Sequence, residues 1–512
     1  MKVVHIATCD FWGSGASTYR LHKALQNKGI KSLMLTLVKT CGDPSVKMVV
    51  LDPISKKDVY IVEKTLPNTE TISNIMINKW KDILEIDPLL GDIQFEFSLW
   101  DSIIDIGELP PIKDADVVHV HMASSFFDFE TAPFYLMGKP VVFTFYDSNG
   151  FTGGCHFPRD CDGYKRGCFD CPFVKNKEVV KNCYEKKKRC YELLNPFIVF
   201  TSSFLADKAL ESDIFYNLER NINIIPPGII IDENKIDKKK IKEHLMIPFN
   251  RPVIMFCAFS LTNQKNRISD FINSFSYLKD LNPYVIIIGN GSAKIEVGKE
   301  LEVLLIEFIP HEEILKWYFK ASDLFISLET EEKIPIRVLE AMSCGLPVVG
   351  YNEGGILEVV AHKKTGYLAK KGDLKDLADG IKWVLNNKRS LSKNVKKVIK
   401  EKFNLEKVAD AYIKLYEKAI KEKGKFNRDK YLKWGEELFL NKNLDFALRI
   451  FDKLLQINEN DAEVLNNIGV IYWEKGMLNK AFEFFKKAYS IFPDSKEIKD
   501  NYIKSLKIIK NK

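Results

Sequence analysis

Short apolar runs alternate with longer amphipathic segments through most of this chain. The runs are rich in Val, Ile and Phe and nearly continuous, which is typical of strands buried on both faces of a parallel sheet. In the first half they lie at 2–7, 32–38, 116–120, 140–146, 197–201 and 222–225, with helices expected at 17–28 and 203–212. This alternation predicts a doubly wound α/β domain.

A polar, lysine-rich segment at 232–244 interrupts the pattern and predicts a connector between domains. A second series of apolar runs follows at 252–259, 284–288, 302–307, 324–328 and 347–349. Two such halves would enclose a cleft, with the carboxyl ends of both sheets facing it, where such folds bind ligands. The predicted domains are 1–240 and 250–404, followed by a helix at 405–424.

After residue 424 the strand pattern ends and a 34-residue repeat begins. Its landmarks are Gly435, Ala447 and Phe451, which recur as Gly469, Ala481 and Phe485. These offsets match the tetratricopeptide repeat, whose small residues let paired helices approach each other. We predict two repeats within 427–512 and a capping helix at 501–509. Since about three repeats are usually needed for stability, we expect the tail to dock on the chain, dimerise or hold a protein partner.

Composition limits the class of protein. The chain has 512 residues, 46% hydrophobic and 28% charged, the balance of a globular protein. Its net charge of +7 is spread along the length, which favours a solvated surface over a nucleic-acid partner. The first residues lack a secretory pattern and no apolar run spans a bilayer, so we expect a cytoplasmic protein, with a peripheral position at the inner membrane face as an alternative.

The most specific motif is the pair Glu332 and Glu340, followed by Ala-Met-Ser-Cys-Gly-Leu-Pro-Val-Val at 341–349 and Gly-Gly-Ile-Leu-Glu at 354–358. Ile334, Pro335 and Ile336 would begin a helix, because proline is favoured in the first turn. The N-terminus of that helix would attract a diphosphate. Carboxylates accept hydrogen bonds from sugar hydroxyls, while two surface glutamates on an ordinary helix are the alternative.

This run resembles the donor-site signature of retaining family-four glycosyltransferases, and the resemblance covers about residues 1–422. It implies a GT-B fold of two facing Rossmann-like domains and transfer of a hexosyl unit, with retention, from a nucleoside-diphosphate sugar to a hydroxyl of a glycan, lipid-linked glycan or protein. It also implies that Glu332 holds the donor hexose and Glu340 the ribose, and that catalysis needs no metal cofactor. A sugar-nucleotide epimerase or hydrolase of the same fold, and an inactive scaffold, are the alternatives.

Further donor and acceptor residues follow the first strands of the two halves. Relatives carry a basic pair after the strand ending near Ser260, and Lys265 matches its lysine. We expect Lys265 to stabilise the departing phosphate, with a solvent-facing lysine as the alternative. Glycines let backbone amides approach a ligand. We assign Gly15, Ser260 and Gly289 to the donor and Gly13 and Ser14 to the acceptor, with tight structural turns as the alternative.

The segment 144–156 resembles a Thr-Leu-His-Asp…Phe-Thr-Gly-Gly-Cys-His pattern of one branch of that family. Tyr146 replaces its histidine, Asp147 is retained, and we assign both to catalysis. Tyrosine can donate a hydrogen bond but is a poor base near neutral pH. His119 and His121 end the preceding strand, and we assign them to the acceptor pocket, with hydrogen-bonded core histidines as an equal alternative.

Four cysteines follow closely in the sequence: Cys155, Cys161, Cys168 and Cys171. Four thiolates ending in a C-x-x-C pair can hold a tetrahedral zinc ion that braces an irregular loop. All four ligand positions would be filled by protein, so the zinc would be structural rather than catalytic. Reduced thiols, which a cytoplasmic location favours over disulfides, are the equal alternative.

Overall fold

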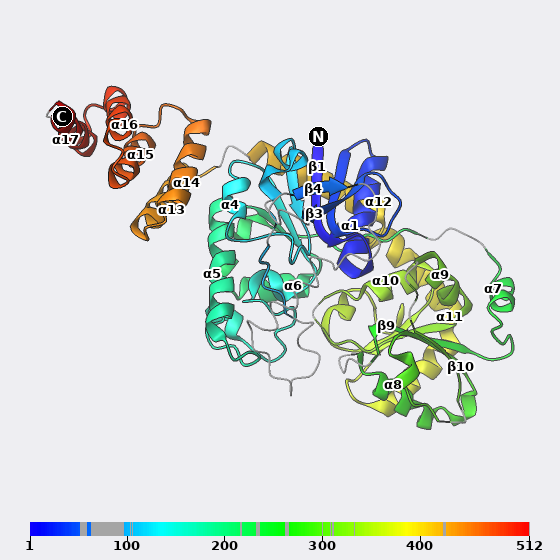
Figure 1. Ribbon diagram of the computed structural model, residues 1–512. Coiled ribbons are helices and arrows are strands. Elements are labelled where there is room, and N and C mark those ends of the chain that lie inside the picture. The colour runs from blue at the N-terminus through cyan, green and yellow to red at the C-terminus, as the bar shows by residue number, and fades with distance from the viewer. Residues whose placement is uncertain are drawn as a thin grey trace. The chain divides into compact units, whose positions relative to one another are not determined.

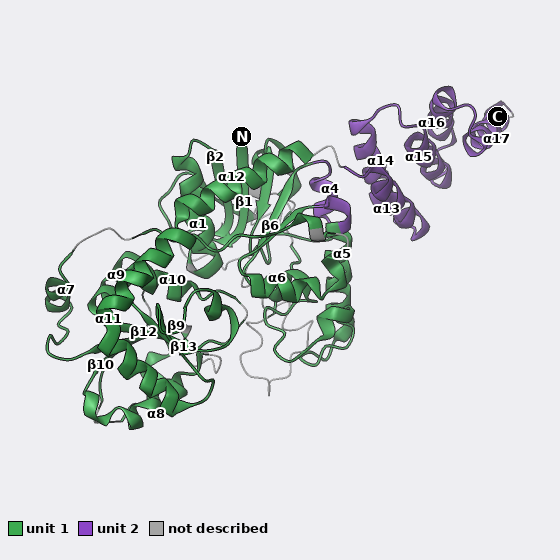
Figure 2. Ribbon diagram, turned by 180° about the vertical axis from the view of Figure 1, so that it is seen from behind, with its two compact units in different colours: residues 1–130, 139–191, 196–422 green, residues 131–138, 192–195, 423–512 purple. Residues whose placement is uncertain are grey.

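The computed structural model describes residues 1–51, 59–62, 97–102, 104, 106–215, 218–231, 236–261, 266–298, 301–307, 309, 312–331, 333–422 and 426–510. The chain divides into two compact units, which Figure 2 shows in green and purple. Unit 1 contains residues 1–130, 139–191 and 196–422, and unit 2 contains residues 131–138, 192–195 and 423–512. Unit 1 is an α/β body with two sheets, which define two lobes, and unit 2 is helical.

The sheet of the first lobe has the order β4-β3-β2-β1-β5-β6-β7-β8 in the part of the chain that the structure describes. All neighbouring pairs are parallel except β3 and β4. The strands are β1 (Lys2–Cys9), β2 (Lys31–Val38), β3 (Val46–Leu51), β4 (Val59–Val62), β5 (Val117–Val120), β6 (Val141–Phe145), β7 (Phe197–Phe200) and β8 (Ile222–Ile224). The six predicted strands are present, while β3 and β4 extend the sheet at the edge beyond β2.

Helices of the first lobe follow its parallel strands: α1 (Trp12–Asn27), α3 (Pro110–Lys113), α5 (Lys177–Leu194) and α6 (Ser203–Leu210). The first begins five residues earlier than predicted, and Gly13 interrupts it with a non-helical φ of 35°. A short 3-10 helix, η3 (Ser148–Phe151), follows β6. The remaining residues of this lobe connect these elements and carry most of the candidate site.

The second lobe has a wholly parallel sheet of order β11-β10-β9-β12-β13-β14. Its strands are β9 (Val253–Ser260), β10 (Tyr284–Asn290), β11 (Glu302–Ile306), β12 (Leu324–Ser327), β13 (Val348–Tyr351) and β14 (Gly366–Ala369). Its helices are α7 (Lys238–His244), α8 (Ile268–Ser274), α9 (Glu312–Ala321), α10 (Ile336–Ser343) and α11 (Leu374–Lys402). Two apolar clusters cover the two faces of the sheet, so the expected doubly wound architecture is confirmed.

A long helix, α12 (Leu405–Lys421), follows the second lobe and packs on the first (Figure 1). Its buried face includes Tyr412 and Tyr416, which lie against β5 and β6. The chain passes between the lobes twice, and these passages are paired: the Ile229 N–H donates to the Phe403 carbonyl at 2.8 Å. The two lobes are thus joined by hydrogen-bonded segments rather than by one flexible strand.

In the part of unit 2 that the structure describes, there are five helices of the C-terminal tail and the short α4 (Ala132–Tyr135). The tail helices are α13 (Arg428–Leu440), α14 (Leu444–Ile457), α15 (Ala462–Glu474), α16 (Leu478–Ile491) and α17 (Lys496–Lys510). A Cβ on Gly435 would lie 2.4 Å from the ring of Phe451, and one on Gly469 would lie 2.6 Å from the ring of Phe485. The repeated glycines are therefore required for close helix pairing, and the tetratricopeptide architecture is confirmed.

The first repeat is covered by two short segments from earlier in the chain, which belong to the same unit. Tyr431 and Trp434 of α13 pack in one cluster with Phe134 of α4 and Leu193. The Tyr431 hydroxyl donates to the Pro133 carbonyl at 3.2 Å. Intramolecular packing thus covers one face of the incomplete repeat array. Within the described residues, no helix is long and apolar enough to span a membrane.

Candidate active site

Several of the predicted site residues that the structure describes lie at the carboxyl edges of the parallel strands of the two sheets. In the first lobe, Gly13 and Ser14 follow β1, and Tyr146 and Asp147 follow β6. In the second lobe, the donor residues lie at the ends of strands in the same way. Ser260 is the last residue of β9, Gly289 is the residue before the last of β10, and Ile334 follows β12. This edge is where open α/β sheets bind ligands.

Two central residues of the prediction, Glu332 and Lys265, lie outside the described residues, so their roles stay predictions. Lys333 and Glu331, on either side of residue 332, form an ion pair at 3.0 Å. The Lys333 ammonium also lies 4.8 Å from the centre of the Phe157 ring, which belongs to the first lobe. The segment that carries the motif therefore contacts the first lobe.

Asp147 is fixed by a hydrogen-bonded network at that contact. Its Oδ2 lies 2.8 Å from Nδ1 of His156, and its Oδ1 accepts the Asn149 N–H at 2.9 Å. The other ring nitrogen of His156 lies 3.0 Å from the Ser98 hydroxyl. Burial alone would raise the pKa of Asp147, but His156 and then the Asn149 N–H and Lys333 hold it below its ordinary value. Asp147 is therefore an oriented carboxylate at neutral pH.

A buried lysine that sequence reasoning missed braces the same loop. The Lys187 ammonium of α5 donates to the Asn149 carbonyl at 2.5 Å and to the Thr152 carbonyl at 2.9 Å. Burial lowers the pKa of Lys187. Lys187 lies on the apolar stripe of α5, at helical spacing from the buried Tyr184 and Tyr191. This spacing was the sequence feature that could have indicated its burial.

Tyr146 is half-buried, and its hydroxyl lies 3.4 Å from Nδ1 of His121. Burial raises the pKa of Tyr146 above its ordinary value, so the hydroxyl stays protonated. Tyr146 can donate a hydrogen bond to a ligand or to His121, but it cannot act as a base near neutral pH.

His119 and His121 are fully buried, as is the neighbouring His5. His119 bonds Tyr416 and Thr144 at 2.7 Å each, and His121 bonds the His5 ring at 3.0 Å. Burial, followed by the neighbouring histidines, lowers the pKa of His119, and burial lowers that of His121 to about 3. This arrangement corresponds to the core alternative, and the geometry does not support the assignment of His119 and His121 to an acceptor pocket.

The two glycine loops differ in what they present. Gly13 is exposed and Ser14 half-buried, whereas a Cβ on Gly15 would lie 2.7 Å from the Cys9 carbonyl oxygen. Gly15 therefore has a packing role at the start of α1. This corresponds to the alternative of a tight structural turn rather than to a donor contact. After β10, the Glu307 carboxylate accepts the N–H groups of Gly291 and Ala293 at 2.8 and 3.1 Å. The backbone amides of that loop are thus already hydrogen-bonded to an anionic side chain of the protein.

The helix predicted after the motif is α10, and Pro335 is its N-cap residue. Ile334 and Pro335 are buried, and Ile336 begins the helix. Glu340 is buried on the same helix, and its carboxylate is bonded to two arginines: Arg337 at 2.6 Å and Arg20 of the first lobe at 3.1 Å. Sequence reasoning missed Arg20, since nothing near residue 20 indicates a partner in the other lobe.

Glu358, the last residue of the motif, makes a second contact between the lobes. Its carboxylate accepts the Ser203 and Phe204 N–H groups at 3.0 and 2.9 Å, and so caps the N-terminus of α6. Gly354 positions this turn, because its φ of 77° favours glycine and a Cβ there would lie 2.2 Å from the Glu331 carbonyl oxygen. We call these contacts, with Arg20–Glu340 and Phe157–Lys333, the interlobe junction.

The four-cysteine loop packs beside the Asp147 network. Cys155, Cys168 and Cys171 are buried, and burial is the main cause that raises the pKa of each thiol. The Gly153 N–H donates to the sulfur of Cys168 at 3.2 Å. In the described part of the chain, the group of possible metal ligands with atoms within 4.8 Å of one another is the histidine cluster, so the four sulfurs are not assembled at ligand distance.

Comparisons with known proteins agree with this fold. Residues 237–402 match the model of the family Glycosyl transferases group 1, and residues 462–495 match that of the Tetratricopeptide repeat. A glycosyltransferase from Rickettsia africae ESF-5 has a TM-score of 0.53 at 16% identity, over 82% of this chain and 99% of that one. An Anabaena protein in complex with UDP has a TM-score of 0.50 at 12% identity, over 81% and 99%.

The two lobes with parallel sheets place this chain in the GT-B fold class. Its segment 237–402 is similar to the group 1 glycosyltransferases, and its tail carries tetratricopeptide repeats. Over 203 residues it is 26% identical to N-acetyl-alpha-D-glucosaminyl L-malate synthase of Bacillus anthracis. This aligned stretch covers 38% of this chain and 53% of that protein. The chain spans about half or less of the length of the first curated relatives that it matches.

Proposed function

We propose that this protein transfers a hexosyl unit from a nucleoside-diphosphate sugar to a hydroxyl acceptor, with retention of anomeric configuration. The observation that carries the proposal is the contact of the motif segment with the first lobe, where Lys333 lies against Phe157 and influences Asp147. A group 1 glycosyltransferase domain thereby faces an oriented carboxylate of the opposite lobe. The acceptor would be a glycan, a lipid-linked glycan or a protein.

In this proposal the N-terminus of α10, which begins after Pro335, favours the diphosphate, because helix N-termini attract anions. Lys265 stabilises the negative charge that develops as the bond between the sugar and the diphosphate breaks. Glu332 holds hydroxyls of the sugar. The acceptor oxygen forms the new bond, and its proton passes to the departing diphosphate. No residue or metal beyond these is needed to balance the charges.

Asp147 and Tyr146 orient the reacting sugar from the first lobe. Asp147 is a carboxylate that accepts hydrogen bonds, and Tyr146 is a protonated hydroxyl that donates one. Gly13 and Ser14 would line the acceptor side of the same edge. The rate enhancement would then come mainly from positioning and from electrostatic stabilisation of the leaving group.

Glu340 is proposed to hold the ribose, and its present partners define what must change. Both oxygens of its carboxylate are bonded to arginines, one of which belongs to the first lobe. Binding of a ribose hydroxyl would replace the Arg20 bond or share the carboxylate with it. Arg20 is therefore a positioning residue that couples donor binding to closure of the lobes.

Three further properties belong to the proposal. The cysteine loop binds a structural zinc ion, for which the sulfurs must move closer together than in this structure. The tetratricopeptide tail recruits a protein partner or acceptor through the surface that α4 does not cover. The protein acts in the cytoplasm, at the inner membrane face when the acceptor is lipid-linked.

The test is a thermal-shift screen of the full chain against nucleoside diphosphates and their sugar conjugates, beginning with UDP and UDP-glucose. A ligand at 100 times its dissociation constant adds about 2.7 kcal/mol to stability. We expect one nucleotide to raise the melting temperature, and Lys265→Ala or Glu332→Gln to reduce the shift. Lys279→Ala, an exposed lysine of the same lobe, is the control and should leave the shift unchanged.

The conjugate that binds is then incubated with and without candidate acceptors, and the products are identified by mass spectrometry. A sugar–acceptor product supports the transferase. Release or epimerisation of the sugar without an acceptor supports an epimerase or hydrolase instead. Absence of binding for every nucleoside diphosphate would contradict the proposal and favour the scaffold.

A further inference from the structure

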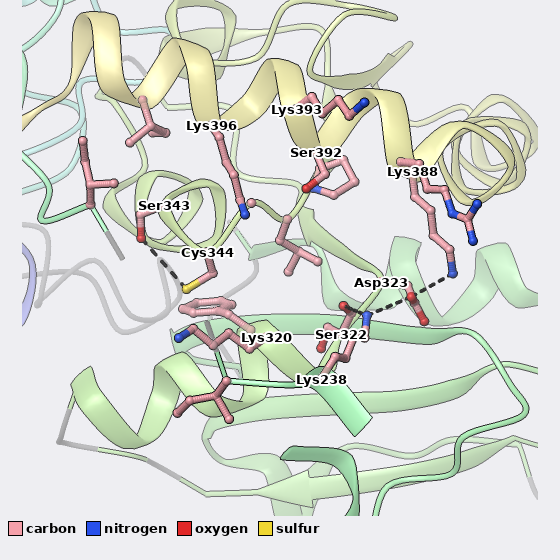
Figure 3. Close-up of a pocket in the computed structure, with 18 of the residues that line it drawn as sticks. Lys238, Lys320, Ser322, Asp323, Ser343, Cys344, Lys388, Ser392, Lys393 and Lys396 are labelled. Carbon is pink, nitrogen blue, oxygen red and sulfur yellow. Dashed lines mark hydrogen bonds and ion pairs between the residues drawn. The ribbon is translucent and has the colours of Figure 1, made fainter. Parts of the chain in front are cut away.

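A large hollow lies in the second lobe at the amino-terminal edge of its sheet, opposite the edge that carries the donor motif. Its volume is about 1140 Å³. It is formed by the start of α7, the end of α9, the turn between α10 and β13, and α11. Figure 3 shows α11 above the hollow and residues Ser322 and Asp323, which precede β12, below it.

The side chains that line this hollow are strongly basic. Lys238 comes from α7 and Lys320 from α9, and α11 contributes Lys388, Arg389, Lys393, Lys396 and Lys400. Among the described residues that line it, the one carboxylate is Asp323. Like charges at close quarters repel each other, so this arrangement costs stability unless an anion occupies it.

Asp323 does not neutralise the cluster. Its carboxylate is shared by Lys238 and Lys388, each at 2.9 Å. Burial would raise the pKa of Asp323, but Lys238 and Lys388 together lower it to about 2, so its single charge is present at neutral pH and already used. Arg389, Lys393, Lys396 and Lys400 form no ion pair with the described acidic side chains.

One of these lysines passes close to a glycine of the backbone around the hollow. Gly345 has a φ of 79°, and a Cβ there would lie 2.5 Å from Cε of Lys396 and 3.0 Å from Oγ of Ser392. The stem of Lys396 therefore crosses the glycine, and Figure 3 shows Lys396 directed from α11 toward the turn at Cys344. Lys388, Ser392 and Lys396 lie four residues apart on one face of α11.

The basic surface continues beyond the hollow. An adjoining hollow of about 520 Å³ shares Lys238, Lys388 and Asp323 and adds Lys242 and Arg251. Burial lowers the pKa of Lys242, because the ammonium is partly withdrawn from water. The cations of the two hollows thus lie along the starts of three adjacent strands, β9, β12 and β13, and among them Arg251 is paired with Glu302.

We propose that this hollow, which we call the amino-edge pocket, binds a phosphate-bearing anion with several negative charges, independently of the donor site. Several phosphates fit because the cations are spread along α11, whereas a single phosphate would reach only a few of them. Lysines serve as point-charge partners for phosphate. The phosphates could belong to a soluble oligophosphate or to a lipid headgroup, and these sources differ in experiment.

The test is isothermal titration calorimetry of the full chain with inorganic tripolyphosphate at low ionic strength. The double variant Lys388→Gln/Lys396→Gln should weaken binding about tenfold or more, which corresponds to about 1.4 kcal/mol, because two charge-assisted contacts to phosphate are lost. Lys375→Gln/Lys397→Gln is the matched control. It removes the same charge from the same helix outside the pocket and should leave the affinity unchanged.

A second arm identifies the source of the phosphates. Vesicles of phosphatidylcholine, with and without phosphatidylglycerol, are sedimented with the protein. Sedimentation with anionic vesicles only, reversed by tripolyphosphate and lost in the pocket variant, assigns the site to a lipid headgroup. Tripolyphosphate binding without sedimentation assigns it to a soluble ligand.

The proposal is overturned if neither probe binds, or if the pocket variant and the control bind alike. It is also overturned if Lys265→Ala abolishes tripolyphosphate binding while the pocket variant retains it, since the anion would then occupy the donor site. Because the pocket variant and the donor-site variant change different residues, loss of one activity leaves the other measurable.

Discussion

Arg20 and Glu340 form an ion pair at 3.1 Å although 320 residues separate them in the sequence. Both side chains are buried, with 5% and 7% of their surfaces exposed. Arg20 lies on the helix after the first strand of the first lobe, and Glu340 lies on the motif helix of the second. Since Arg337 holds the other oxygen of Glu340 at 2.6 Å, the carboxylate is restrained from both lobes.

Loss of this pair should destabilise unit 1. We expect Arg20→Gln, which also removes the Arg20 bond to Glu312 at 3.1 Å, to lower the free energy of unfolding by about 2–3 kcal/mol. This is below the usual cost of breaking a buried pair, because Arg337 remains on Glu340. Urea denaturation measures the change. Lys28→Gln is the control, since Lys28 pairs with the exposed Glu406 and Asp410 and should matter little. Equal effects of both variants would contradict the prediction.

The cap that Glu358 provides should contribute to closure of the lobes. Glu358→Gln removes the charge facing the N-terminus of α6, and we expect a loss of about 0.5–2 kcal/mol. The loss should shrink at high salt, because the charge is partly exposed. Glu353→Gln on the same turn serves as the control, because Glu353 pairs with Lys371 within its own lobe. If the small-angle scattering curve of Glu358→Gln is the same as that of the wild type, Glu358 has no role in closure of the lobes.

The histidine cluster predicts how stability depends on pH. Burial lowers the pKa of His5 and His119, that of His121 to about 3 and that of His22 to about 4. In the unfolded chain these histidines take up protons below about pH 6.5, whereas the folded protein does not. Stability should therefore be fully present above that pH and fall on acidification, by about 1.4 kcal/mol per pH unit for each histidine.

The measurement compares urea midpoints between pH 7.5 and pH 5. His22→Gln should flatten the dependence, because one buried group that resists protonation is gone. His244→Gln, an exposed histidine of α7, should not. A midpoint that stays constant over this range would show that the cluster is protonated in the folded state.

Metal content tests the cysteine loop. If zinc binds there, metal analysis of protein purified without chelators should find zinc in equal amount to the chain, and Cys161→Ser or Cys171→Ser should reduce it. Cys190→Ser is the control, because this cysteine is buried on α5 outside the loop. Protein that is folded and free of zinc would establish the reduced-thiol alternative.

Local patterns predicted the architecture because the forces that form it act over short sequence distances. The buried parallel strands appear as continuous apolar runs, and the repeat landmarks recur because each glycine contacts the phenylalanine sixteen residues later. β14 was missed because Gly366–Ala369 contains few branched residues, although the strand is largely buried. β3 and β4 pair with each other in antiparallel fashion, which the parallel pattern did not anticipate.

The site was predicted less completely, because its partners meet only in the folded chain. The sequence placed Glu340 on the right helix but could not indicate that Arg20 would bond to it. It included Glu358 in the motif, yet its role at the N-terminus of α6 depends on how the two lobes meet. His119 and His121 lie at the end of a strand. Only the packing of α12 over this strand shows that the Tyr416 hydroxyl is hydrogen-bonded to a ring nitrogen of His119.

The tail offers a substitution in which packing should reverse an intrinsic preference. Replacing a glycine in a helix with alanine ordinarily stabilises by about 0.5–1 kcal/mol. At Gly469 the new Cβ would lie 2.6 Å from the Phe485 ring, and overpacking of this kind costs about 1–3 kcal/mol. We therefore expect Gly469→Ala to destabilise α15 and α16, measured by hydrogen exchange of these helices in the full chain. Phe485→Leu supplies the control, because it removes the ring: in that background Gly469→Ala should be harmless or stabilising, and a penalty of the same size in both backgrounds would show that the ring is not the cause.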